Sequence, residues 1–241
     1  RGIGLDLVER VDITTPAGRR RAIETWEDEL LIVGAPVYFG RVQTNAIQWL
    51  NTIRSHRTPA VCVVVYGNRE YDDALLELRD AMANNGCVPV TCGAYIGEHS
   101  FSSAETPIAA CRPDAADLSH AQSFGERIRK KIASVPPASQ IIPVTPPGQY
   151  PYIEMEAGKQ RLRDLNLASV SGHCTKCGEC AELCPAGAID FENSALVDHG
   201  KCILCHACIK HCPAGARKMT NEMIKSIANH LSGVLQERKE P

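Results

Sequence analysis

Eight cysteines in the last third of the chain have a type and spacing that could do chemistry. The run CTKCGECAELCP starts at residue 174 and CILCHACIKHCP at residue 202, and both follow the pattern C-x2-C-x2-C-x3-C-P. Cysteine thiolates are the usual ligands of iron-sulfur clusters, and four of them hold one [4Fe-4S] cluster. The pattern therefore predicts two [4Fe-4S] clusters and the transfer of single electrons.

Runs of this pattern are typical of bacterial two-cluster ferredoxins, in which the fourth cysteine of each run binds the other cluster. The ligand sets are then crossed. One predicted set is Cys174, Cys177, Cys180 and Cys212, and the other is Cys202, Cys205, Cys208 and Cys184. The alternatives are a zinc site, a thioredoxin-like C-x-x-C motif and disulfides. None explains two identical four-cysteine runs, and zinc ribbons use separated pairs.

Residues between these cysteines are candidates for tuning the clusters. Gly178, Gly187 and Gly215 would let backbone amides approach the sulfurs, and Ile189 and Ile203 would shield the clusters from water. An equally weighted alternative is that these residues only shape turns and core. Four histidines are expected to be exposed loop residues without a ligand role: His173, His199, His206 and His211.

The charge balance and the hydropathy of the chain argue against binding to nucleic acid or to a membrane. The 241 residues include 26 basic and 28 acidic ones, so no broad basic surface would attract nucleic acid or an anionic membrane. The longest apolar run, Ala60 to Tyr66, is far shorter than the roughly 20 residues of a membrane-spanning helix. No secretory signal pattern opens the chain. We expect a cytoplasmic protein without a membrane span.

Short apolar runs alternate with helical patterns before residue 135, which predicts an α/β domain with a doubly wound parallel sheet. The expected strands are Leu5 to Ile13, Leu30 to Val37, Ala60 to Tyr66 and Val88 to Ile96. The expected helices are Thr44 to Ile53, Tyr71 to Asn85 and Asp117 to Ile132.

A proline-rich stretch separates this domain from the cysteine runs. We expect domains at 1–135 and 166–241, joined by a linker at 136–165. The second domain would be a small α+β unit with a C-terminal helix from Met223 to Leu235. Packing of this helix on its own domain is favoured over the alternative, a face that docks a partner.

Ligands of doubly wound sheets bind beyond the carboxyl ends of the strands. Two segments occupy such positions, APVYFGR at 35–41 and YGNREYDDAL at 66–75. The first offers backbone amides and the aromatic faces of Tyr38 and Phe39 to a flat ligand, and the second offers the polar groups of Asn68, Tyr71 and Asp72. Each segment taken alone is more often an ordinary strand-to-helix turn.

At these residues the chain resembles proteins of anaerobic bacteria and archaea that fuse a flavodoxin-like domain to a two-cluster ferredoxin. APVYFGR resembles the loop that lies against the isoalloxazine ring of FMN, and YGNREYDDAL resembles the loop at the polar edge of the ring. RPDAADL at 112–118 also resembles the family pattern. The resemblance implies noncovalent FMN binding by the first domain, with these contacts: Pro36, Val37, Tyr38, Phe39, Gly40, Arg41, Gly67, Asn68, Tyr71 and Asp72.

One part of the family pattern is missing from this sequence. A flavodoxin begins with a strand and a Ser/Thr- and Gly-rich loop whose amides bind the FMN phosphate. Leu5 to Ile13 instead matches the second strand of the family, and residue 1 is Arg rather than Met. We therefore expect the central strand and the phosphate loop to lie upstream of residue 1.

These observations favour an electron-transfer iron-sulfur flavoprotein that acts as a redox adaptor between FMN and the two clusters. No convincing acid-base constellation is present, which favours an electron-transfer protein or oxidoreductase subunit over a stand-alone enzyme. The alternatives are a flavin-dependent reductase of a small molecule and a flavin-free wiring subunit of a larger oxidoreductase complex. Residues 171–219 carry five acidic and five basic side chains, a balance that favours fixed contacts with another domain or subunit.

Overall fold

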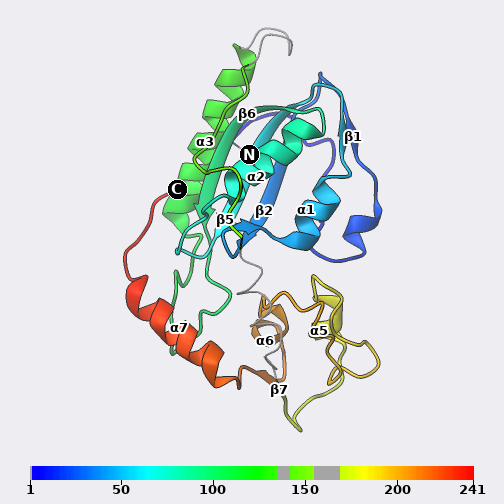
Figure 1. Cartoon of the computed structure of the whole chain (residues 1–241), viewed down its shortest axis with the longest axis vertical. Coiled ribbons are helices and arrows are strands. Elements are labelled where there is room, and N and C mark those ends of the chain that lie inside the picture. The colour runs from blue at the N-terminus through cyan, green and yellow to red at the C-terminus, as the bar shows by residue number, and fades with distance from the viewer. Residues whose placement is uncertain (1, 135–141, 155–168) are drawn as a thin grey trace.

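A mixed β-sheet organises the N-terminal part of the chain (Figure 1). The computed structural model describes residues 2–134, 142–154 and 169–241. Three parallel strands, β2 (Leu31–Tyr38), β5 (Pro59–Tyr66) and β6 (Val88–Ile96), form the sheet with the short β3 (Arg41–Val42), in the order β3-β2-β5-β6. A separate parallel pair consists of β1 (Glu24–Thr25) and β4 (Arg54–Ser55).

Helices pack on both faces of this sheet, which suits its apolar strands. The face that carries α3 is covered only in part, since Ile32 of β2 and Val65 of β5 are 54% and 42% exposed there. The first face carries α1 (Thr44–Leu50) and α2 (Ala74–Asn84), whose Leu50, Leu78 and Met82 pack with Cys62 and Val64 of β5. On the opposite face, α3 (Ala115–Ala133) packs Ile128 against Val61 and Val90. A short 3-10 helix, η1, spans Gly18–Arg20. Among the described residues, every helix is too short or too polar to cross a membrane.

The sheet is not purely parallel as predicted, because β3 turns back antiparallel along the end of β2. Phe39 and Gly40 make this turn with φ values of 55° and 77°. A Cβ atom at Gly40 would overlap the carboxylate of Asp72, so the turn needs glycine there. The class is α/β with a mixed sheet.

The predicted strand from Leu5 to Ile13 is wrong, because this segment is in no strand. Leu7 and Val8 are 77% and 89% exposed, while Val11 and Ile13 pack against the first core, the cluster between the sheet and helices α1 and α2. A strand must hydrogen-bond to a neighbour, and no other described strand pairs with this segment.

Part of the predicted linker, residues 142–154, is held against the α/β part of the chain. Val144 N donates to the Pro89 carbonyl at 3.0 Å. The buried carboxylate of Asp73 accepts from Gln149 N at 2.9 Å and from Ile153 N at 2.7 Å. The rest of the predicted linker, 136–141 and 155–165, lies outside the described residues, and the domain boundaries stay predictions.

The cysteine runs form two similar halves, as their sequence repeat indicates. The elements of this part are β7 (Ser169–Val170), α5 (Glu179–Glu182), α6 (Ala207–Lys210), β8 (Arg217–Lys218) and α7 (Glu222–Val234). Positive φ values recur 28 residues apart, at the pairs Lys176 and Leu204, Gly178 and His206, and Gly187 and Gly215. The repeat in sequence is therefore also a repeat in backbone conformation.

The C-terminal helix packs against both parts of the molecule, not only against the cysteine runs as expected. Ile224 of α7 is buried with Leu204. Phe39 and Phe101, which come from the α/β part, pack against the same cluster. The helix thus joins the two parts.

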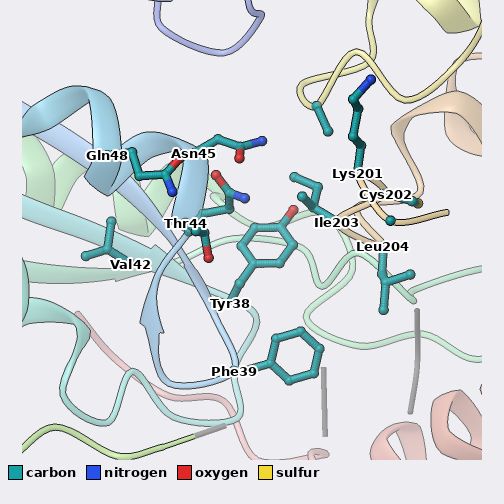
Figure 2. Close-up of a pocket in the computed structure, with 13 residues that line it drawn as sticks. Tyr38, Phe39, Val42, Thr44, Asn45, Gln48, Lys201, Cys202, Ile203 and Leu204 are labelled. Carbon is teal, nitrogen blue, oxygen red and sulfur yellow. The ribbon is translucent and has the colours of Figure 1, made fainter. Parts of the chain in front are cut away.

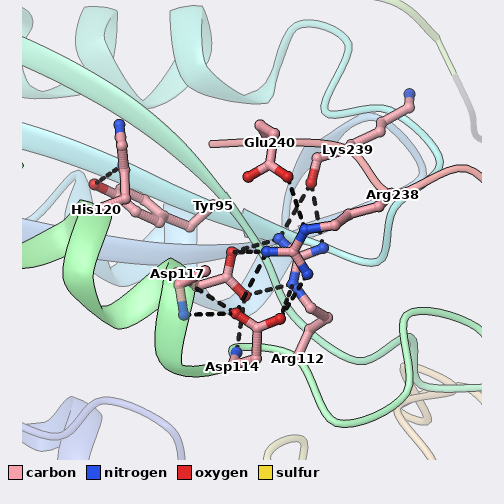
Figure 3. A network of polar contacts seen from close by, with 9 residues as sticks. Tyr95, Arg112, Asp114, Asp117, His120, Arg238, Lys239 and Glu240 are labelled. Carbon is pink, nitrogen blue, oxygen red and sulfur yellow. Dashed lines mark hydrogen bonds and ion pairs between the residues drawn. The ribbon is translucent and has the colours of Figure 1, made fainter.

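Beyond α7, the last residues return to the α/β part (Figure 3). Arg112 and Asp117 form a buried ion pair with two hydrogen bonds, and Arg112 also donates to the Lys239 carbonyl at 3.2 Å. Arg238 pairs with Asp114 at 2.5 Å. These contacts fix the C-terminal tail at the N-terminus of α3.

Candidate iron-sulfur centres and the adjoining cavity

Four cysteines line each of two small cavities in the C-terminal part. The first cavity is lined by Cys174, Cys177, Cys180 and Cys212. The second is lined by Cys184, Cys202, Cys205 and Cys208. The fold thus places the fourth cysteine of each run beside the first three of the other run, and all eight thiols are free.

Backbone amides point at the fourth cysteine of each run. Ala188 N donates to Cys184 Sγ and Ala216 N donates to Cys212 Sγ, both at 3.2 Å. Gly187 and Gly215 precede these alanines with φ values of 58°, a conformation that favours glycine. Amide donors stabilise negative charge on sulfur, so these turns are suited to hold metal-bound thiolates.

The two cavities differ in their exposure to water. Burial raises the pKa of the Cys205 thiol to about 11 and that of Cys208 to about 12. In the first cavity, hydrogen bonds from backbone amides lower the pKa values of Cys174 and Cys212, and Cys177 is exposed. Ile189 and Ile203 both line the second cavity with apolar side chains. The second cavity is therefore the drier of the two.

Only two of the four histidines near the cysteines are exposed to solvent. His173 and His211 are exposed and His199 is half-buried. His206 is buried, and its ring stacks on Phe101 with 4.7 Å between the ring centroids. Burial lowers the pKa of His206 to about 4. The prediction of exposure is wrong for His206 because its loop faces the α/β part.

Polar contacts join the cysteine-bearing part to the loops at the carboxyl ends of the parallel strands. Lys210 Nζ pairs with Glu98 at 2.9 Å and donates to the His99 carbonyl at 3.1 Å. A further contact comes from η1, outside these loops, where Arg19 donates to the Pro185 carbonyl at 2.6 Å. In an α/β sheet these ends are where ligands bind, so the cysteines stand beside the expected ligand edge.

A larger cavity of about 280 Å³ lies between the two parts (Figure 2). Its α/β wall contains the rings of Tyr38 and Phe39 and the polar side chains of Thr44, Asn45 and Gln48. The opposite wall is the segment Gly200, Lys201, Cys202, Ile203 and Leu204. Cys202 also lines the second cysteine cavity.

Tyr38 lies near both the larger cavity and the second cysteine cavity. Burial raises the pKa of its phenol, and the neighbouring Cys205 and Cys202 raise it further. The Tyr38 ring points across the cavity towards the Ile203 segment (Figure 2). An aromatic ring in the α/β part therefore lies close to two cysteines of the second cavity.

Of the ten residues predicted to contact a flat ligand, the structure brings Tyr38 and Phe39 into this cavity. Their neighbours in the first loop face elsewhere. Pro36 is exposed, Val37 packs on the first core, and Gly40 adjoins Asp72. Arg41 pairs with Glu77 at 2.6 Å.

The second predicted loop is occupied by other contacts. Asn68 donates through Nδ2 to the carbonyls of Leu235 and Glu237, at 3.2 and 2.9 Å, so the C-terminal tail covers it. Gly67 lies against His99, Tyr71 packs edge-on against Tyr66 and Asp72 pairs with Arg69. The structure does not bring this loop to the cavity.

Sequence reasoning missed the wall formed by residues 200–204 and the polar residues of α1. Residues 200–204 lie more than 160 positions after Tyr38 in the sequence, and no local pattern indicates that the two segments are in contact. For α1, Thr44 and Asn45 directly follow the first loop, and this position could have indicated that their side chains line the same cavity.

Comparison with known proteins identifies one match. Residues 173–216 match the family described as the 4Fe-4S dicluster domain. Neither the curated proteins nor the solved structures yielded a match. No group of three or more His, Cys, Asp or Glu side chains among the described residues is arranged to hold a single metal ion. The family match at 173–216 supports a ferredoxin-like domain that binds 4Fe-4S clusters and has a role in iron-sulfur electron transfer.

Proposed function

We propose that the protein is an electron-transfer iron-sulfur flavoprotein that passes electrons between FMN and two [4Fe-4S] clusters as a redox adaptor. Cluster I is held by Cys174, Cys177, Cys180 and Cys212. Cluster II is held by Cys184, Cys202, Cys205 and Cys208. The flavin ring binds in the 280 Å³ cavity. The observation that carries this proposal is that Cys202 lines both the cavity and the site of cluster II.

The residues around the cavity suit a flat aromatic ligand. Tyr38 and Phe39 provide ring surfaces for stacking, and Thr44, Asn45 and Gln48 provide hydrogen-bonding groups on one side. The volume of about 280 Å³ is just below the roughly 300 to 1,000 Å³ typical of small-molecule pockets. The cavity therefore suits the ring system, and the ribityl phosphate extends beyond it.

FMN would supply two-electron chemistry that can proceed in single steps, which matches the one-electron clusters. The residues of this chain determine the distances between the centres. Cys202 lines both sites, so an electron can pass from the cavity to cluster II through this one side chain. Through the crossed ligands Cys184 and Cys212, each cysteine run binds both clusters, which keeps the two clusters close to each other.

The wider setting of the protein follows from the same proposal. The α/β part, predicted at 1–135, is the flavodoxin-like domain, and the clusters exchange electrons with redox partner proteins, including subunits of a larger complex. Cluster ligation by eight of the twelve cysteines, in place of a disulfide framework, suits a reducing cytoplasm.

A flavin-free wiring subunit is the second candidate, and one observation favours it. The loop predicted to contact the polar edge of a flavin is held by the C-terminal tail through Asn68 and does not face the cavity. In that case the α/β part would serve as a docking scaffold.

The absorption spectrum of the anaerobically purified, full-length protein separates these candidates. We expect a flavin band with vibronic structure above the broad iron-sulfur absorption, and FMN in the acid extract. Intact clusters without extractable flavin, even after incubation with FMN, would establish the wiring subunit instead.

Variants then test the position of the flavin. Tyr38→Leu removes an aromatic ring, worth about 0.5 to 1.5 kcal/mol, so FMN should bind roughly two- to tenfold more weakly. The matched control is Tyr95→Leu, because Tyr95 is also half-buried but lies on β6 against His120. Equal FMN affinity in both variants would place the flavin elsewhere.

A further inference from the structure

Arg217 is the residue at which the two cysteine repeats differ in chemistry. The segment CPAGAI at 184–189 is matched by CPAGAR at 212–217, so Arg217 stands where the first repeat has Ile189. Both positions are buried, with Ile189 9% and Arg217 3% exposed. One half of the repeat therefore buries an apolar side chain where the other buries a cation.

The guanidinium of Arg217 has few partners for a buried charge. It donates through one terminal nitrogen to the Ser194 carbonyl, and its Nε–H has no hydrogen-bond partner among the described residues. None of the ion pairs between described side chains includes it. Moving an unpaired charge out of water costs several kcal/mol, so such a group needs compensating negative charge.

That negative charge is available at the two cluster sites. Arg217 is in the lining of both cysteine cavities, the one formed by Cys174, Cys177, Cys180 and Cys212 and the one formed by Cys184, Cys202, Cys205 and Cys208. A [4Fe-4S] cluster with four thiolate ligands is an anion, and reduction adds one more negative charge. A nearby cation stabilises the reduced form more than the oxidised form, and net charge is one of the factors that set cluster potentials.

We propose that Arg217 is a charge-compensating residue shared by the two clusters, whose buried guanidinium raises the reduction potentials of both. This inference rests on the proposed binding of two clusters by the eight cysteines. It is independent of flavin binding, since Arg217 does not line the 280 Å³ cavity.

The test uses the full-length protein with both clusters loaded. Arg217→Met removes the charge and keeps much of the length of the side chain, Arg217→Gln removes the charge and keeps an N–H donor, and Arg217→Lys keeps the charge. The control is Ile189→Met, at the equivalent buried position of the first repeat. Iron content and circular dichroism are measured first, and the midpoint potentials follow from titrations monitored by electron paramagnetic resonance.

We expect Arg217→Met and Arg217→Gln to lower both midpoint potentials by at least 59 mV, a tenfold change in a one-electron equilibrium. Arg217→Lys should retain most of the wild-type potentials, and Ile189→Met should shift both by less than the neutral Arg217 variants do. Unchanged potentials in the neutral variants at full iron content would overturn the proposal, and so would a shift confined to one cluster.

Loss of cluster from both neutral variants with an unchanged circular dichroism spectrum would assign Arg217 to cluster assembly and would also overturn it. Failure of the underlying proposal is distinguishable from these results. In that case the wild-type protein itself would lack about eight iron atoms and two cluster signals.

Discussion

The crossed arrangement of ligands predicts which pairs of cysteine substitutions damage a single cluster and which pairs damage both. Cys174 and Cys212 line the same cavity, whereas Cys205 lines the other. The double variant Cys174→Ala/Cys212→Ala therefore removes two ligands from cluster I and none from cluster II. The double variant Cys205→Ala/Cys212→Ala removes one ligand from each cluster.

The expected difference is large. The first double variant should keep about four iron atoms per chain in one intact [4Fe-4S] cluster. The second should keep no cluster with four cysteine ligands, and it should show three-iron signals or little iron. Cys212→Ala alone should impair cluster I and leave cluster II, although Cys205 and Cys208 are its neighbours in sequence.

The assay is iron analysis together with spin quantitation of the reduced and oxidised proteins by electron paramagnetic resonance. Uncrossed ligand sets would reverse the outcome. Cys205→Ala/Cys212→Ala would then keep one intact cluster and Cys174→Ala/Cys212→Ala would keep none, which would refute the assignment drawn from the two cavities.

Three further predictions concern the contacts that position these sites. Asp117→Asn should lower the free energy of unfolding by about 1.5 to 3 kcal/mol in chemical denaturation, because it removes the charge of the nearest carboxylate partner of the buried Arg112 and leaves Asp114 at 4.0 Å; Glu126→Gln, exposed on the same helix, should have little effect. Burial lowers the pKa of His99 from 6.5 to about 4, so the unfolded chain binds a proton that the native imidazole does not. Stability should therefore fall as the pH drops from about 6.5 towards 4, and denaturation of His99→Gln across this range should show a shallower fall. Asp73→Asn weakens two charge-assisted hydrogen bonds to residues 149–153, each worth about 1.5 to 3 kcal/mol. Limited proteolysis of this segment should therefore be roughly tenfold faster or more. The exposed control Asp28→Asn should leave the cleavage rate unchanged, and an equal rate in both variants would contradict this prediction.

The C-terminal tail also bears on the choice between the two proposed functions. Lys239 Nζ donates to the Arg69 carbonyl and pairs with Glu70, and Asn68 binds the tail at two carbonyls. The loop after β5 is thus bound to the tail and does not line the cavity. A flavin bound in the cavity would therefore depend on Tyr38 and Phe39 more than on this loop.

Patterns within short stretches of sequence determined much of this protein. The three-residue spacing of the cysteines indicated cluster ligation, since one loop can place three thiolates around one cluster. Apolar runs and helical periodicity likewise predicted β2, β5, β6 and the helices α1, α2, α3 and α7 to within a few residues. These signals are local because hydrogen bonding within a helix and the alternation of a strand depend on nearby residues.

Contacts between distant residues were decided only by the tertiary structure. Leu5 to Ile13 has the composition of a strand, but a strand forms only where another offers its edge. The burial of His206, the cavity between Tyr38 and Cys202, and the tail over Asn68 each join segments that no local pattern pairs. The cysteine runs show which residues can bind iron, and the packing of the two parts decides what lies next to them.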